Sequence, residues 1–140
     1  MEEKVAKFMN KKLSFDCIVI GGGLSGLTAT LALSKIGLSM AIIDKTSLKM
    51  VKKNEGDQRT TAVSASGKKI FEALDVWDSL KEDAEPILDI VVSEKGKRGH
   101  LNFDHQTVGT EPMGHILDNI QLKNSLISSI RSQKNIQLFP

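Results

Sequence analysis

The spacing of apolar residues in residues 16–44 predicts a strand, a helix and a second strand. Residues 15–20 form a short apolar run with three consecutive β-branched residues, which is typical of a strand buried on both faces of a parallel sheet. A glycine-rich turn follows, and apolar side chains then recur at helical spacing, at Leu24, Leu27, Leu31 and Ile36. Gly37 is placed to end this helix, and residues 40–43 form a second apolar strand that stops at Asp44.

The rest of the pattern predicts two more helices, a β-hairpin and a final strand. Residues 45–59 are polar and lack a period, so we expect a long loop there. The expected elements are a helix over 64–80 with a break near Asp75, a hairpin with strands 87–94 and 100–104 and a turn over 95–99, a helix over 117–131 and a strand over 135–139. Ser64 is the expected N-cap of the first of these helices, and Pro86 marks a boundary after it.

The apolar stripe of the helix over 64–80 and the short lead-in complete the expected organisation. The stripe consists of Val63, Ile70, Phe71, Leu74, Trp77 and Leu80. An aromatic residue in such a stripe is typical of the core, so Trp77 is assigned there. Residues 1–13 are expected to be a frayed or loosely helical lead-in, and residues 14–140 to form part of one α/β domain.

The turn after the first strand has the glycine spacing that binds a dinucleotide. Gly21, Gly23 and Gly26 stand in the order G-x-G-x-x-G. Gly21 allows the tight turn, Gly23 lets the backbone approach a pyrophosphate, and Gly26 lets the helix pack closely on the strand. The N-terminus of the helix then offers free N–H groups and a positive dipole end to the phosphates. Asp44, at the tip of the second strand, is placed to accept hydrogen bonds from an adenosine ribose.

The context of this motif favours a binding site over a flexible glycine loop. A strand precedes the glycines, a helix follows them, and a second strand ends in an acidic residue, which is the arrangement that the motif requires. The polar loop then supplies Arg59, whose guanidinium group can fork onto phosphate oxygens just before the next helix. The lysines of the same loop are more typical of a solvated face.

Composition excludes several other classes of protein. The chain has 140 residues and a formal net charge of +2, which indicates neither a nucleic-acid footprint nor an acid-binding surface. Cys17 is the only cysteine, so no internal disulfide is possible, and its position in a strand predicts a buried apolar residue. The histidines match no zinc spacing and are expected at the surface or in turns, at His100, His105 and His115. No metal site and no hydrolytic triad is predicted.

The chain shows no sign of export or of a membrane span. Residues 1–12 lack the apolar core of a signal peptide, so a cytoplasmic location is expected. The uncharged run over residues 17–34 contains four glycines, two serines and two threonines, which disfavours a transmembrane helix.

Several segments, taken in order, narrow the class of dinucleotide-binding protein. They are GGGLSG with Asp44, DQRTTAVS at 57–64, LDVWDSL at 74–80, Pro86-Ile87 with the following Val-Val-Ser, and GHILDN at 114–119 with Leu122 and Leu126. Together they resemble the aromatic-ring hydroxylases of ubiquinone biosynthesis, which are FAD-dependent monooxygenases of the p-hydroxybenzoate hydroxylase class. The resemblance covers nearly all of residues 14–140.

The resemblance implies a Rossmann-like FAD-binding fold with a β-hairpin insertion. It implies a flavoprotein that NAD(P)H reduces and that hydroxylates a phenolic or quinone-precursor substrate with O2. The residues that it assigns to FAD are Gly21, Gly22, Gly23, Gly26, Asp44, Arg59 and Asn119. Arg59 matches an arginine near the cofactor phosphates, and Asn119 matches a polar or basic position against FAD. No catalytic residue is assigned, and relatives usually have Glu at the position of Asp44.

The same resemblance implies that the chain contains an incomplete domain. The family has a second FAD motif, a Gly-Asp pair much further along the chain, and a substrate domain, and residues 14–140 resemble only the N-terminal part of the FAD-binding domain. The alternatives are a stand-alone nucleotide-binding module without catalysis and an NAD-dependent reductase, which the segments 57–64 and 114–126 disfavour. Peripheral association with the inner membrane or with other enzymes is left open, as is the ring position hydroxylated.

Overall fold

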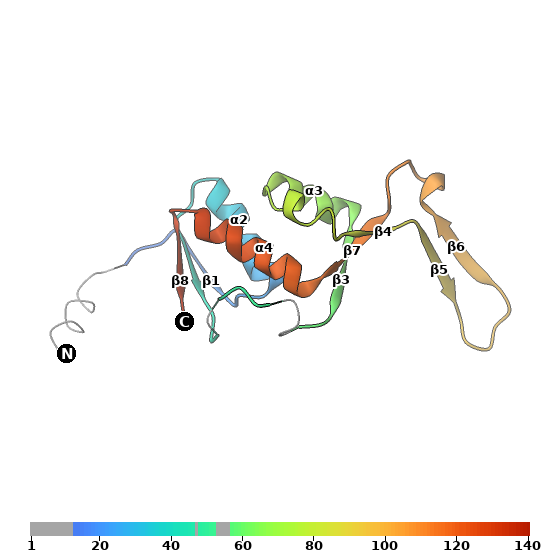
Figure 1. The fold of residues 1–140 in the computed structure, drawn as a ribbon, viewed down its shortest axis with the longest axis horizontal. Coiled ribbons are helices and arrows are strands. Elements are labelled where there is room, and N and C mark those ends of the chain that lie inside the picture. The colour runs from blue at the N-terminus through green and yellow to red at the C-terminus, as the bar shows by residue number, and fades with distance from the viewer. Residues whose placement is uncertain (1–12, 47, 53–56) are drawn as a thin grey trace.

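The computed structural model describes residues 13–46, 48–52 and 57–140, so nearly all of the predicted lead-in and part of the predicted loop over 45–59 lie outside it. Among the described residues, a parallel sheet has three strands in the order β1, β2, β8 (Figure 1). These strands are β1 (Cys17–Ile20), β2 (Met40–Ile43) and β8 (Ile136–Phe139). The predicted strand–helix–strand unit is confirmed, and the predicted final strand joins its sheet.

Helix α2 (Leu24–Lys35) connects β1 to β2 and ends where the sequence predicts. Gly37 follows with a φ of +94°, the left-handed conformation that favours glycine after a helix. Ile36, which continues the apolar spacing of the sequence, is the C-cap residue and is exposed. The helix therefore has its buried face at Leu27, Thr30, Leu31 and Ser34.

The prediction that the first strand is buried on both faces is wrong. Ile18 is 56% exposed and Ile20 is 85% exposed, because β1 lies at the edge of the sheet and helices cover one side only. Figure 1 shows α2 and α4 (Asn119–Ser132) on the same side of the three strands. The opposite face of the sheet is open in the described part of the chain.

A second sheet lies beside the first and is antiparallel. It joins β3 (Thr60–Ser64), β7 (Gly114–Asp118) and β4 (Glu85–Ile87), with β7 in the middle. Thr60 is opposite Asp118, and Ser64 is opposite Gly114. The sequence prediction missed β3, which lies between the predicted loop over 45–59 and the predicted helix over 64–80, and β7, part of which it placed in the last helix.

The two missed strands lack a local signal because their stability comes from pairing across the chain. Each has five residues and buries few large side chains, chiefly Val63 in β3 and Leu117 in β7. Pro86 was predicted as a boundary but lies inside β4. A proline is tolerated there because β4 is an edge strand, where the missing N–H removes no bond from the sheet interior.

Helix α3 (Ala65–Ala73) confirms the predicted cap and the predicted break. The hydroxyl oxygen of Ser64 accepts a hydrogen bond from the backbone N–H of Gly67 at 3.1 Å, as an N-cap does. The helix stops before Asp75, whose φ is +55°, and a 3₁₀ turn follows at η1 (Trp77–Ser79). Ile70 was assigned to the apolar stripe but is 52% exposed, since the nine-residue helix turns it away from the core.

The hydrophobic core lies between the parallel sheet and helices α2, α3 and α4. Helix α4 buries the four residues predicted for its apolar face, Leu122, Leu126, Ile127 and Ile130. Trp77 is 8% exposed, which confirms its assignment to the core. His115 was expected at the surface, but it is half-buried in β7 with its ring edge-on to Trp77 at 5.0 Å between centroids. Burial, with a smaller contribution from the charge of Lys68, lowers the pKa of His115.

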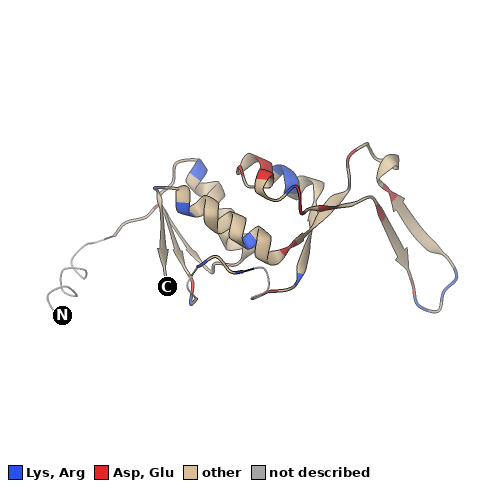
Figure 2. Cartoon of the chain, viewed as in Figure 1, with Lys and Arg blue, Asp and Glu red and all other residues tan. Residues whose placement is uncertain are grey.

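The predicted hairpin is present and extends away from the rest of the chain (Figure 1). Its strands are β5 (Asp89–Ser93) and β6 (His100–Asp104), and the turn between them contains Gly96 and Gly99 with positive φ. Figure 2 shows basic residues at the hairpin turn and mixed acidic and basic residues on α3. No helix among the described residues has both the length and the apolar content that a bilayer crossing requires.

We predict that Gly26→Ala destabilises the fold. A Cβ at this position would lie 2.0 Å from the carbonyl oxygen of Gly21, which is backbone and cannot turn aside. Helix α2 would have to move away from β1, at a cost of about 1 to 3 kcal/mol in free energy of unfolding, the range for overpacking. Urea unfolding followed by circular dichroism measures the change. Gly109→Ala is the control, because a Cβ there meets no atom within 4 Å. Equal stability of the two variants would contradict the close contact.

Candidate functional site

The glycine turn has the conformation that the sequence motif requires. Gly21 has a φ of +107°, and its N–H donates to the carbonyl of Ile43 at 2.8 Å, so the turn begins directly at the carboxyl end of the sheet. Gly26 lies against Gly21 as described above. Gly23 is the N-cap residue of α2, and a Cβ there would meet no atom of the protein within 4 Å. The space beside Gly23 is therefore open to a ligand.

Gly22 and Asp44 join the turn to the end of β2. The N–H of Gly22 donates to one carboxylate oxygen of Asp44 at 2.6 Å. Thr46 donates to the other oxygen twice, from its N–H at 2.7 Å and from its hydroxyl at 2.5 Å. The hydroxyl of Thr46, followed by the N–H of Gly22, lowers the pKa of Asp44 to about 2. Asp44 is thus ionised at neutral pH and also supports the turn.

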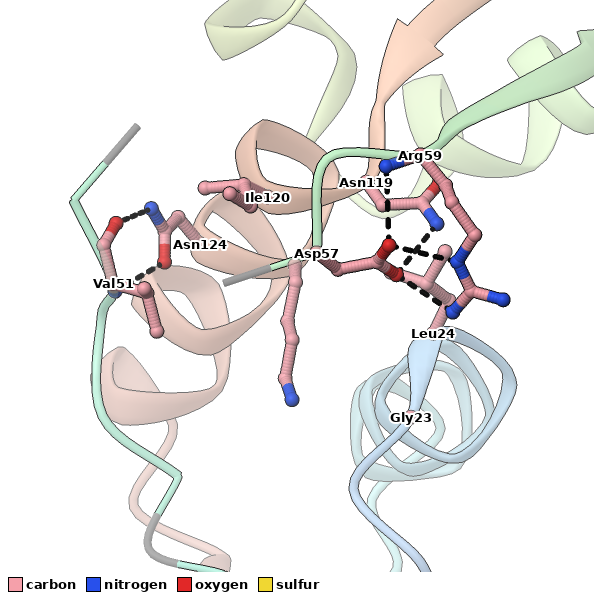
Figure 3. A pocket seen from close by; sticks show the side chains of 9 residues that line it. Gly23, Leu24, Val51, Asp57, Arg59, Asn119, Ile120 and Asn124 are labelled. Atoms are coloured by element: carbon pink, nitrogen blue, oxygen red, sulfur yellow. Dashed lines mark hydrogen bonds and ion pairs between the residues drawn. The ribbon is translucent and has the colours of Figure 1, made fainter. Parts of the chain in front are cut away.

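A cleft of about 370 Å³ opens between the N-termini of α2 and α4 (Figure 3). Its lining consists of Gly23, Leu24, Val51, Asp57, Arg59, Asn119, Ile120, Lys123 and Asn124. Of the residues predicted to contact FAD, the cleft brings together Gly23, Arg59 and Asn119. The other four predicted residues lie outside its lining. Gly21 and Gly22 form the turn behind Gly23, Gly26 of α2 packs against this turn, and Asp44 bonds to it from the end of β2.

Two helix N-termini face this cleft, and the structure gives neither a side-chain cap. Gly23 caps α2 without a side-chain hydrogen bond, and neither helix has an acidic residue in its first turn. The N-cap of α4 is Asp118, whose side chain also makes no capping hydrogen bond. The backbone N–H of Asn119 donates to the carbonyl of Arg59. The other N–H groups of the two first turns and the two positive dipole ends converge on the cleft and favour a bound anion. Lys123 adds a cationic side chain to the same wall.

Asp57, Arg59 and Asn119 form one hydrogen-bonded group at the mouth of the cleft (Figure 3). The guanidinium group of Arg59 donates to both carboxylate oxygens of Asp57, from Nε at 2.7 Å and from Nη2 at 2.8 Å. The side-chain amide of Asn119 donates to Asp57 at 2.9 Å. The hydrogen bond from Arg59, and then that from Asn119, holds the pKa of Asp57 well below its usual range. The side chain of Arg59 remains 82% exposed.

The wall opposite Arg59 is held to α4 by Asn124. Its side-chain amide accepts from the N–H of Val51 at 3.0 Å and donates to the carbonyl of Val51 at 2.7 Å. Arg131 further along α4 donates to the carbonyl of Leu48 at 3.0 Å. Leu48 in turn fills the space beside Gly22, where its side chain lies 2.3 Å from the place of a Cβ.

The sequence prediction missed Asp57, Lys123 and Asn124 as members of the site. Lys123 follows Asn119 by one helical repeat, so the predicted helix alone contained a signal that the two share a face. Asp57 stands two residues before Arg59, but only the fold shows that its carboxylate lies between Arg59 and Asn119. Among the described residues, no cluster of His, Cys, Asp or Glu is placed to hold a metal ion. The lining instead combines two helix N-termini with the side chains of Arg59 and Lys123, an arrangement that favours an anion.

Comparison with known proteins shows which proteins this chain is similar to. The family described as FAD binding domain matches residues 16–73. The chain is 29% identical over 115 residues to the ubiquinone hydroxylase UbiL of Rhodospirillum rubrum, covering 82% of this chain and 27% of that protein. It is 25% identical over 146 residues to the mitochondrial ubiquinone biosynthesis monooxygenase COQ6 of Dictyostelium discoideum, covering 94% of this chain and 30% of that protein.

Solved structures show the same fold. The p-nitrophenol 4-monooxygenase PnpA of Pseudomonas putida matches with a TM-score of 0.65 and 18% identity, over 86% of this chain and 30% of that chain. PqsL of P. aeruginosa, in complex with 2-aminobenzoylacetate, matches with a TM-score of 0.69 and 13% identity, over 89% of this chain and 33% of that chain. The predicted Rossmann-like α/β fold is confirmed.

The chain is thus similar in sequence to an FAD binding domain and in fold to solved monooxygenases such as PnpA. More narrowly, the chain is similar to the ubiquinone hydroxylases, and the predicted resemblance to that group is confirmed. The chain spans about 27 to 30% of the length of the UbiL and COQ6 relatives that it matches.

The lowered pKa of Asp44 leads to a prediction about its titration and its contribution to stability. Its folded pKa of about 2 lies below the value near 3.9 of an unfolded chain, so its contribution to stability is present above about pH 4 and is lost as the pH falls through 2. We predict that Thr46→Val, which removes the largest cause, moves the carboxyl titration of Asp44 toward its ordinary value. NMR of the Asp44 carboxyl carbon across pH 1.5 to 6 measures the titration midpoint in the wild-type protein and in the variant. An unchanged midpoint in the variant would show that the Thr46 hydroxyl bond is absent in solution.

Proposed function

We propose that this chain binds FAD and holds its adenosine and pyrophosphate end in the cleft beside Gly23. The observation that carries the proposal is the convergence of an open glycine turn, two helix N-termini without side-chain caps and Arg59 on one cleft of about 370 Å³. Backbone N–H groups bind the pyrophosphate, and Arg59 and Lys123 neutralise its charge. The family match over residues 16–73 supports FAD as the dinucleotide.

The residues present fit such a cofactor. The empty space next to Gly23 leaves room for a phosphate, while the close contact at Gly26 keeps α2 directed at it. Asp44 is ionised, and the described residues supply donors to about three of its four acceptor positions, so it can accept from a ribose hydroxyl while it supports the turn. Its charge disfavours a 2′-phosphate and so favours FAD over a phosphorylated nicotinamide cofactor at this position.

We further propose that the reaction served is hydroxylation of a phenolic quinone precursor in ubiquinone biosynthesis, with NAD(P)H as the reductant and O2 as the oxidant. The names of the UbiL and COQ6 relatives support the pathway, and the monooxygenase fold supports the reaction class. FAD supplies the redox and oxygen chemistry when bound. The residues described here bind and orient the cofactor, and residues 14–140 correspond to the N-terminal part of its domain. A cytoplasmic location is part of this proposal.

We predict that the purified chain binds FAD and that Gly23→Val removes this binding without unfolding the protein. A valine side chain would fill the space of the pyrophosphate, and the backbone at Gly23, with φ of −77° and ψ of 177°, accepts a β-branched residue. The loss should be at least tenfold in affinity, about 1.4 kcal/mol. Titration calorimetry with FAD and with ADP-ribose measures it, and circular dichroism reports the fold. Gly109→Val, in an open loop position, is the matched control. Undiminished binding by a folded Gly23→Val variant would refute the pyrophosphate assignment.

The reaction has its own test. We predict that residues 1–140 alone, supplied with FAD, NAD(P)H and a prenylated phenol, form no hydroxylated product, because the cleft provides contacts for the adenosine end only. Coupled oxygen transfer needs the flavin ring in a site closed to water. NAD(P)H oxidation and product formation are measured together, on this chain and on a protein extended to the length of its relatives. Coupled turnover by the 140-residue chain would overturn this assignment, and turnover by neither protein would refute the reaction class.

A further inference from the structure

We propose that Asp57 is a positioning residue for the phosphate end of the site: its carboxylate holds the Arg59 guanidinium and the Asn119 amide in the arrangement that receives a diphosphate. This inference rests on the proposed FAD site and names a residue of that site whose role is indirect. Neither the glycine motif nor the predicted FAD contacts include Asp57. Although Asp57 lines the cleft, its carboxylate acts on the proposed ligand through Arg59 and Asn119.

The carboxylate of Asp57 is fully used by the protein. It accepts from the backbone N–H of Arg59 at 3.1 Å, from Arg59 Nε at 2.7 Å, from Arg59 Nη2 at 2.8 Å and from Asn119 Nδ2 at 2.9 Å. A carboxylate has about four acceptor positions, so these four donors saturate it. Asp57 therefore has no acceptor position left for a ligand. Its role is to hold the side chains of Arg59 and Asn119 in place.

Arg59 keeps donors free in this arrangement. A guanidinium group has about five N–H donors in a planar fork, and the side-on contact with Asp57 uses one on Nε and one on Nη2. The remaining donors are on the far edge of the fork, and Arg59 and Leu24 line the same cleft. The side chain is 82% exposed, so without Asp57 it would sample many rotamers. Asp57 thus reduces the entropy that Arg59 loses when it binds a phosphate.

Asn119 is held in a defined orientation by the same network. The hydroxyl of Thr61 in β3 donates to the side-chain oxygen of Asn119, which leaves the Nδ2 group directed at Asp57. The backbone N–H of Asn119 donates to the carbonyl of Arg59 at 3.0 Å. The network therefore connects the segment 57–59 to the first residue of α4, whose N-terminus faces the cleft.

The negative charge of Asp57 opposes phosphate binding, but this repulsion is weaker than the benefit of positioning Arg59 and Asn119. A carboxylate near the cleft repels a phosphate, but Asp57 and Arg59 are both in contact with water, where charge interactions beyond the first contact are strongly screened. Arg59 also balances that charge directly. Hydrogen-bond geometry is not screened in this way, so the positioning effect dominates.

The test compares ADP with adenosine as titration ligands. We expect Asp57→Asn to weaken ADP binding by about tenfold, the scale of one lost charge-assisted contact, and to leave adenosine binding unchanged because adenosine has no phosphate. Arg59→Ala should weaken ADP binding similarly, and the double variant should lose less than the two single losses combined, since Asp57 acts in part through Arg59. Asp89→Asn on the hairpin has the same change in net charge and is the matched control.

Asp57→Glu separates position from charge and serves if Asp57→Asn fails to fold. It keeps the charge but moves the carboxylate by one methylene, so we expect weaker ADP binding with unchanged adenosine binding. Tighter ADP binding by Asp57→Asn would show that Asp57 competes with phosphate for Arg59 and would overturn the inference. Equal loss for ADP and adenosine, or wild-type affinity for ADP in both variants, would overturn it too and leave a structural role. If the wild-type chain binds neither FAD nor ADP, the proposed FAD site falls first and this inference with it.

Discussion

The contact between Gly26 and the backbone of Gly21 determines where the rest of the site can form. A residue with a Cβ would meet the Gly21 carbonyl oxygen at 2.0 Å, so only glycine lets α2 lie this close to β1. That proximity places the N-terminus of α2 at the carboxyl end of the parallel sheet, where open α/β sheets bind ligands. Helix α4 then packs on α2 through buried leucine and isoleucine side chains, and its own N-terminus comes to the same place.

Once the two helix ends are adjacent, polar contacts bring irregular segments of chain to them. On one side, Asp57 connects Arg59 to Asn119, and on the other, Asn124 pairs with both backbone groups of Val51. Asp44 and Gly22 fix the turn from behind. Each of these bonds joins residues that the core has already brought close, so the apolar packing establishes the cleft and the polar contacts complete its walls.

Local signals in the sequence were sufficient for part of this structure. The glycine turn, the Ser64 cap, the break at Asp75, the hairpin turn and the apolar face of α4 are set by residues within a few positions of one another, and all were predicted. Strands β3 and β7 were missed because Thr60 finds its partner at Asp118, and neither segment has an alternating apolar pattern by itself. The exposure of Ile18 and Ile20 depends on which elements cover the sheet. Gly23, Arg59 and Asn119 were predicted from the glycine motif and from the family resemblance. Asp57 and Asn124 were identified only in the fold, because their roles depend on which segments lie beside them.

The pairing of Asn124 with Val51 has a consequence for how the cleft can change its width. Because the side-chain amide bonds to both the N–H and the carbonyl of Val51, it pairs with the backbone as a neighbouring strand would, and with Arg131 it attaches residues 48–52 to α4. Asn119 fastens the opposite rim to the first turn of that helix. Both rims are therefore attached to α4, so a shift of α4 along α2 would change the gap between them and Gly23. Such a shift would take place at the buried apolar layer between α2 and α4. Substitutions in this layer, which is remote from the cleft, would therefore change how far the cleft closes.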